Sequence, residues 1–104
     1  MLSLSSGFNY FLCSEPVTLR YRHAGLRNYI KGQLHRDPTN GDIYIFLSKD
    51  GHRVRIYYFH HQGEILTEKI LHGNHFVEPI FDEARGCYHI SWESFVYLVE
   101  GIVL

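Results

Sequence analysis

The chain has 104 residues, of which 45% are hydrophobic and 15% aromatic, and its net charge is −1. This length suits one compact core, so we expect a single domain over residues 1–104. The aromatic content excludes a disordered chain, and no apolar run reaches the roughly 20 residues of a membrane-spanning helix. Two cysteines, Cys13 and Cys87, without a secretory signal favour free thiols in a cytoplasmic protein.

The charges are unevenly distributed along the chain. Residues 20–55 carry eight basic and three acidic side chains, whereas residues 56–104 carry two basic and seven acidic ones. This split predicts a basic surface for a polyanion and an acidic surface for a protein partner. If folding interleaves the two halves, the charges form only a solvated surface.

The N-terminal half begins with an aromatic, apolar segment, residues 8–13, which predicts a short strand. An amphipathic helix is expected over residues 23–35, with Arg27 and Lys31 on a stripe beside its apolar one. Glycines within it cost about 1 kcal/mol each relative to alanine, so packing must stabilise this helix. Asp-Pro-Thr-Asn-Gly at residues 37–41 then predicts a turn. The apolar stripe consists of Leu26, Tyr29, Ile30 and Leu34.

The clearest local signal is a β-hairpin formed by residues 42–48 and 53–59 around the sequence Lys-Asp-Gly-His. The second strand alternates two sets of side chains, which predicts one buried and one exposed face. Residues 64–71 should add a third strand of an antiparallel meander, with Leu66 and Ile70 on one side. The buried set of the second strand is Val54, Ile56 and Tyr58, and the exposed set is Arg53, Arg55 and Tyr57.

The C-terminal part starts with residues 76–81, an extended segment interrupted by Pro79, and a polar loop at 82–86. A helix is expected over residues 92–100, because Ser91 is a suitable N-cap and Gly101 lies near its end. Its apolar face should cover the sheet and consists of Trp92, Phe95, Val96, Val99 and Ile102. The fold class is therefore α+β: a small single domain whose antiparallel β-meander or hairpin sheet packs with an N-terminal-half helix and a C-terminal helix.

The order of these motifs resembles the accessory protein TnpB (Orf-two-like) of the insertion sequence sixty-six family of transposable elements. Several weak motifs in fixed order over nearly the whole chain seldom coincide by chance. The chain departs from this family where relatives carry an arginine run, here Lys49-Asp50-Gly51, and a Trp-Asp pair, here Phe59-His60. The matching pieces are Leu19-Arg20, Gly25-Leu26, Arg36-Asp37-Pro38, Gly41-Asp42, IYIF with RVRIYYF, Lys69, Leu71, Gly73, Phe76, Pro79 and ISWESFVYLVEGI.

The resemblance implies a cytoplasmic, non-enzymatic helper of DNA transposition that acts without a cofactor beside the transposase encoded by the element. The transposase carries the cutting and joining chemistry. Given this resemblance, we expect DNA to contact basic side chains and one aromatic residue within residues 20–57. The candidate DNA-binding residues are Arg20, Arg22, Arg27, Lys31, Arg53, Arg55 and Tyr57.

Other readings of the same residues remain open. If DNA is not a ligand, the basic side chains serve only to keep the protein soluble, and Tyr57 packs against a neighbouring strand. A protein adaptor would instead dock on the transposase through the acidic half or the terminal helix.

Metal and nuclease chemistry are weaker alternatives. His60-His61, His72-x-x-His75 and Cys87-x-His89 are metal-ligand types, yet none completes a tetrahedral set. A Mg²⁺ nuclease is disfavoured because Glu68 and Lys69 are adjacent on a strand and point to opposite faces.

Overall fold

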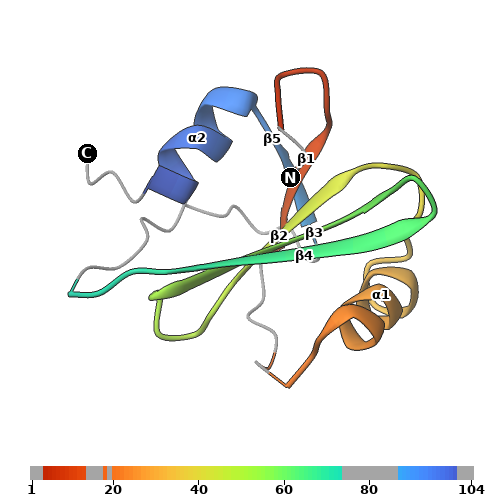
Figure 1. The fold of residues 1–104 in the computed structure, drawn as a ribbon, viewed down its shortest axis with the longest axis horizontal. Coiled ribbons are helices and arrows are strands. Elements are labelled where there is room, and N and C mark those ends of the chain that lie inside the picture. The colour runs from red at the N-terminus through yellow and green to blue at the C-terminus, as the bar shows by residue number, and fades with distance from the viewer. Residues whose placement is uncertain (1–3, 14–17, 19, 74–86, 101–104) are drawn as a thin grey trace.

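A computed structural model describes residues 4–13, 18, 20–73 and 87–100. In this part of the chain, a five-stranded sheet lies between two helices, with α1 and α2 on opposite sides of it (Figure 1). The elements are β1 (Tyr10–Cys13), α1 (His23–Gly32), β2 (Ile43–Leu47), β3 (Arg53–His60), β4 (Gly63–Ile70), β5 (Cys87–Ile90) and α2 (Trp92–Glu100).

The strands are ordered β4-β3-β2-β1-β5 across the sheet. β2, β3 and β4 form the expected antiparallel meander, which confirms the hairpin and the third strand. The α+β class is confirmed, and the sheet is mixed because β1 and β2 pair in parallel beside this antiparallel meander. α1 lies between these two strands in the chain and supplies the long crossover connection that parallel neighbours require.

β5 pairs antiparallel with β1 and was not expected from the sequence. The predicted extended segment at residues 76–81, with its Pro79, and the predicted loop at residues 82–86 lie outside the described residues.

Both faces of the sheet are covered, which creates two apolar clusters. On one face Phe95 and Leu98 of α2 pack on side chains of β1, β2 and β3. On the other, Leu26 and Ile30 of α1 pack on Tyr44, Phe46 and neighbouring strand residues. All five residues of β2 are consequently buried. A continuous apolar strand such as IYIFL is typical of this two-sided burial.

Local packing and capping define the two helices. Gly25 lets α1 approach the ring of Tyr21, because a Cβ atom at residue 25 would lie 3.0 Å from three atoms of that side chain. The backbone N–H of Ser94 donates to the Ser91 Oγ at 3.0 Å, which confirms the predicted N-cap of α2. Leu98 of α2 is buried, whereas Val96, which was expected on the apolar face, is only half-buried. Gly101 and Ile102 lie outside the described residues. Neither α1 nor α2 has the length and hydropathy that a bilayer-spanning helix requires.

A tight turn joins β3 to β4. His61 and Gln62 both have positive φ angles, +49° and +63°, as the two central residues of a type I′ turn require. This turn geometry matches the right-handed twist of the flanking strands. Neither residue is the asparagine or glycine that usually occupies these positions.

Candidate nucleic-acid interface

Arg55 is buried, although strand alternation suggested that it faces solvent. Only 2% of the residue is exposed. Its guanidinium donates to the carbonyl oxygens of Tyr21 and Thr18, in the segment that leads into α1. The prediction that Arg55 lies on an exposed basic face is therefore wrong, because the chain before α1 covers this part of β3.

The charge of Arg55 is balanced from β4. The Glu68 carboxylate lies 3.6 Å from Arg55 Nε and 3.1 Å from Arg53 Nη1. Arg55 Nε itself is buried and makes no hydrogen bond with the described residues. Burial lowers the pKa of Arg55, the attraction of Glu68 opposes that effect, and the nearby Arg22 and Arg53 add to it. Arg55 is therefore the buried member of this charge cluster, whereas Glu68 and Arg53 reach solvent.

Tyr57 is also buried, so the prediction of an exposed stacking residue is wrong too. Its hydroxyl donates to Glu64 Oε1 at 2.9 Å, and Arg27 Nη1 of α1 donates to the same oxygen at 2.6 Å. Burial raises the pKa of Tyr57, and the hydrogen bond to Glu64 raises it further. The Glu64 carboxylate thus links α1 to β3 and β4.

The two charged halves of the sequence are interleaved in the fold. Glu64 and Glu68, both from the acidic half, pair with arginines of the basic half. The prediction of separate basic and acidic surfaces is therefore wrong for β4, where the interleaved alternative holds. Alternation along a strand identifies which side chains share a face, but not which neighbouring strand supplies counter-charges.

The other predicted contact residues reach solvent to different extents. Arg20, Arg22 and Lys31 are exposed. The side chains of Arg27 and Arg53 remain 42% and 36% exposed beside their carboxylate partners. Arg27 and Lys31 come together in one surface depression, whereas Arg20 and Arg22 precede α1 at its opposite end.

An open groove of about 600 Å³ lies where α1 passes into the following turn. We call it the basic groove, since its lining contains Arg27, Lys31 and Arg36 but only one carboxylate, that of Asp37. The Asp37 carboxylate accepts hydrogen bonds from the backbone N–H and the hydroxyl of Thr39, and both bonds lower the pKa of Asp37. The full lining is Arg27, Asn28, Lys31, His35, Arg36, Asp37, Pro38 and Thr39.

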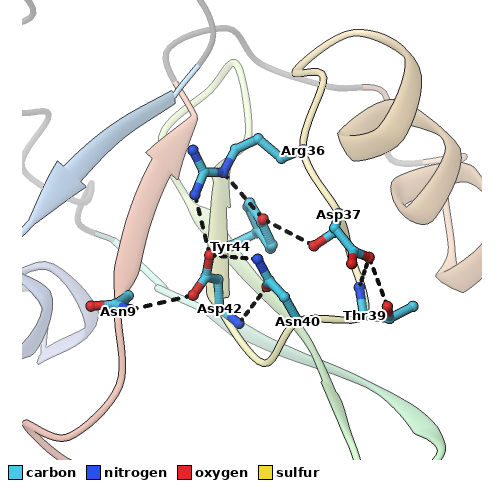
Figure 2. Close-up of polar contacts among 7 residues, drawn as sticks. All are labelled: Asn9, Arg36, Asp37, Thr39, Asn40, Asp42 and Tyr44. Carbon is cyan, nitrogen blue, oxygen red and sulfur yellow. Dashed lines mark hydrogen bonds and ion pairs between the residues drawn. The ribbon is translucent and has the colours of Figure 1, made fainter.

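Arg36 is held in a single orientation at the edge of this groove (Figure 2). Its Nη2 donates to Asp42 Oδ2 at 3.2 Å, and its Nε donates to the Tyr44 hydroxyl at 3.3 Å. The guanidinium carbon lies 3.9 Å from the ring centre of Phe11, in cation–π geometry. The hydrogen bond to Tyr44 is the main reason why the pKa of Arg36 is raised.

The turn that carries Asp42 is braced in the same way. Asn40 Nδ2 donates to Asp42 Oδ2 at 3.0 Å, and the Asp42 backbone N–H donates back to Asn40 Oδ1 at 2.9 Å (Figure 2). Asn9 Nδ2, just before β1, lies 3.5 Å from Asp42 Oδ1. Gly41 allows this geometry because its φ angle is +91°. Arg36 was not among the residues predicted to contact DNA, although Arg36-Asp37-Pro38 and Gly41-Asp42 are two of the motifs that resemble the family.

The described residues bring no three potential metal ligands of the His, Cys, Asp or Glu type together. His75 of the proposed His72-x-x-His75 pair lies outside them. Glu68 and Lys69 diverge as expected: Glu68 pairs with arginines of β3, while Lys69 Nζ donates to the Val99 carbonyl of α2 at 2.7 Å.

Comparison with known proteins supports the resemblance noted from the motifs. The model of the family described as IS66 Orf2 like protein matches residues 8–104. The chain is 33% identical to the uncharacterized protein y4jC of Sinorhizobium fredii over 102 residues, which are 98% of this chain and 86% of that protein. No solved structure matches the chain significantly. The chain therefore belongs to the family of IS66 Orf2-like proteins, which places it among the accessory proteins of insertion sequences.

Proposed function

We propose that this insertion-sequence accessory protein assists transposition by binding the phosphate backbone of DNA in the basic groove. One observation carries the proposal: Arg27, Lys31 and Arg36 line one depression with a single carboxylate, whose charge is engaged by Thr39. Phosphate contacts of this kind position a protein on a duplex without reading its sequence.

Lys31 is the leading contact in this groove. It is exposed and has no ion-pair partner among the residues that the structure describes. Arg36 contributes a charge whose orientation is set in advance by Asp42, Tyr44 and Phe11, so little side-chain entropy is lost when a phosphate binds. Arg27 offers the N–H groups that its bond to Glu64 leaves unused.

We infer that the protein itself does not cut DNA. Metal-assisted cleavage needs carboxylates that converge on a cation. Asp42, Glu64 and Glu68 instead face arginine side chains, each on a different partner.

A second candidate function is that of an adaptor that docks on the transposase. The outward side of α2 carries Glu93, Tyr97 and Glu100 at helical spacing, and all three are exposed. Tyr97 is 49% exposed, and an exposed tyrosine flanked by acids is the type of side chain that anchors protein interfaces.

A salt titration on duplex DNA tests the first proposal against the second. We expect Lys31→Ala to weaken binding to element-end and unrelated duplexes alike. It should also flatten the log–log salt dependence by about 0.9, because one fewer phosphate displaces its counterions. Lys49→Ala is the matched control: it removes the same charge from an exposed residue beyond the other end of β2 and should leave the slope unchanged.

Two results would contradict the groove. Equal slopes for wild type and Lys31→Ala would place the contact elsewhere. Absence of DNA binding at low salt, together with co-purification of the transposase that Tyr97→Ala abolishes, would favour the adaptor.

A further inference from the structure

Cys13 and Cys87 lie directly opposite each other on the neighbouring strands β1 and β5. They are register partners in the antiparallel pairing of β1 and β5, at the last residue of β1 and the first residue of β5. Both side chains lie on the α1 side of the sheet, within the apolar cluster of Leu26 and Ile30. More than seventy residues separate these two thiols in the sequence, so the fold alone brings them together.

The pairing brings the two residues within disulfide range. Directly opposed residues of antiparallel strands have Cα atoms roughly 4.5–5.5 Å apart. Disulfides span Cα separations of about 4.4–6.8 Å. β5 has four residues and lies at the end of the strand order, so a small adjustment toward β1 disturbs few hydrogen bonds.

We propose that Cys13 and Cys87 are a reversible dithiol site that a low-molecular-weight disulfide, such as oxidised glutathione, converts to an intramolecular disulfide. This inference does not rest on the proposed function, because its test measures thiol oxidation and not DNA binding, although Arg36 of the basic groove lies near both thiols. Opposed cysteines place the Cβ atoms somewhat farther apart than a relaxed disulfide prefers, which makes such a bond easier to reduce.

The different burial of the two thiols determines the order of the steps. Cys87 is half-buried and Cys13 is only 3% exposed. The Cys87 thiolate attacks one sulfur of the oxidant, and one glutathione thiolate leaves. The Cys13 thiolate then attacks the Cys87 sulfur of this mixed disulfide, and the second glutathione thiolate leaves. The two protein thiols lose two electrons to the oxidant, and their two protons pass to the released thiolates.

The surroundings of the two thiols keep their oxidation slow at neutral pH. Burial raises the pKa of both thiols, and the Arg36 guanidinium opposes this effect. Because the thiolate is the attacking species, oxidation should accelerate as the pH rises above neutrality. The same cation disfavours a bound metal ion beside the two sulfurs.

The test treats the folded chain with oxidised glutathione at mildly alkaline pH and follows intact mass, free thiols and peptide maps. We expect the loss of two hydrogens without a glutathione adduct, a peptide that links Cys13 to Cys87, and a monomer on non-reducing gels. Closing a loop this long should also raise the Tm by roughly 10 °C, and a reducing agent should reverse the shift.

Single-cysteine variants provide the matched controls. Cys87→Ser should remain folded by circular dichroism, because residue 87 is only half-buried, and should show neither the cross-link nor the Tm shift. Cys13→Ala should retain a glutathione adduct on Cys87, because the resolving thiol is missing. A stable adduct on wild-type Cys87, or disulfides that form only between chains, would overturn the proposal.

Discussion

Arg55 is a charged residue whose side chain is buried in the interior of the protein. Its guanidinium donates to the carbonyl oxygens of Tyr21 and Thr18 in the crossover segment. The Thr18 carbonyl also accepts from the Tyr21 backbone N–H, so the Tyr21 carbonyl depends more on Arg55 for a donor. A buried carbonyl without a hydrogen bond costs free energy comparable to that of the lost bond. Arg55 therefore attaches the segment before α1 to β3.

Replacement of Arg55 by alanine should destabilise the protein by about 2–4 kcal/mol, because it removes the donor of the Tyr21 carbonyl and creates a cavity. The midpoint of urea unfolding measures this effect. Arg53→Ala is the control, since that side chain shares Glu68 but is 36% exposed, and it should cost less than about 1 kcal/mol. Equal losses for the two variants would show that Arg55 contributes only a surface ion pair.

The same residues show what strand alternation determines. The pattern of β3 correctly separates Val54 and Ile56 from Arg55 and Tyr57. The pattern does not reveal that α1 and the segment before it cover the face of the sheet that carries Arg55 and Tyr57. Two signals could have done so: β2 is apolar on both faces, and the apolar stripe of α1 needs a sheet on which to pack.

The turn between β3 and β4 places non-glycine residues in an unfavourable backbone region. His61 and Gln62 have φ angles of +49° and +63°, where a Cβ atom crowds the backbone. The double substitution His61→Asn and Gln62→Gly should stabilise the fold by about 1–2 kcal/mol, since Asn-Gly is the preferred pair for a type I′ turn.

Urea unfolding should show this gain as a higher midpoint with an unchanged m-value. Gln33→Gly is the control, because Gln33 at the end of α1 has a φ angle of −92° and gains nothing from glycine there. If the double substitution lowers the midpoint, the contact between the rings of His60 and His61, whose centres lie 3.7 Å apart, stabilises the turn more than its backbone destabilises it.

Elements with strong local signals were predictable from the sequence. The hairpin, the amphipathic stripe of α1 and the Ser91 cap all depend on residues within a few positions of one another. β5 was not predictable, because the four residues Cys87–Ile90 form a strand only through pairing with β1. The parallel pairing of β1 with β2 is likewise a property of the crossover and leaves no periodic pattern in either strand.

The basic groove shows the same division at the level of the site. Arg27 and Lys31 were selected because they are four residues apart on one helix. Arg36 was not, since its orientation depends on Phe11, Asp42 and Tyr44, which converge from three segments of the chain. The identity of a basic residue can be read from the sequence, but its accessibility follows from the tertiary fold.

At the scale of the whole molecule, four buried tyrosines couple stability to alkaline pH. Burial raises the pKa of each of them, and an unfolded tyrosine titrates near pH 10. Below about pH 10 both states are protonated and the stability is fully present. As the pH rises above this value, ionisation favours the unfolded chain. The four residues are Tyr10, Tyr44, Tyr57 and Tyr58.

We expect the free energy of unfolding to fall above pH 10 by up to about 1.4 kcal/mol per pH unit for each tyrosine. Urea titrations at neutral and strongly alkaline pH, with tyrosinate absorbance as a second signal, measure the decline. Tyr57→Phe should make it shallower, because one of the four titrating groups is removed. Stability that does not change across this range would mean that the phenols ionise equally in both states.

The position of β5 beside β1 also constrains the order in which the domain can be assembled during synthesis. β2, β3 and β4 are consecutive and can pair as soon as they leave the ribosome. The outer edge of β1 has to wait for residues 87–90, which are translated after every other strand of the described sheet. Until then, β1 presents unpaired backbone groups that a strand of another chain could occupy.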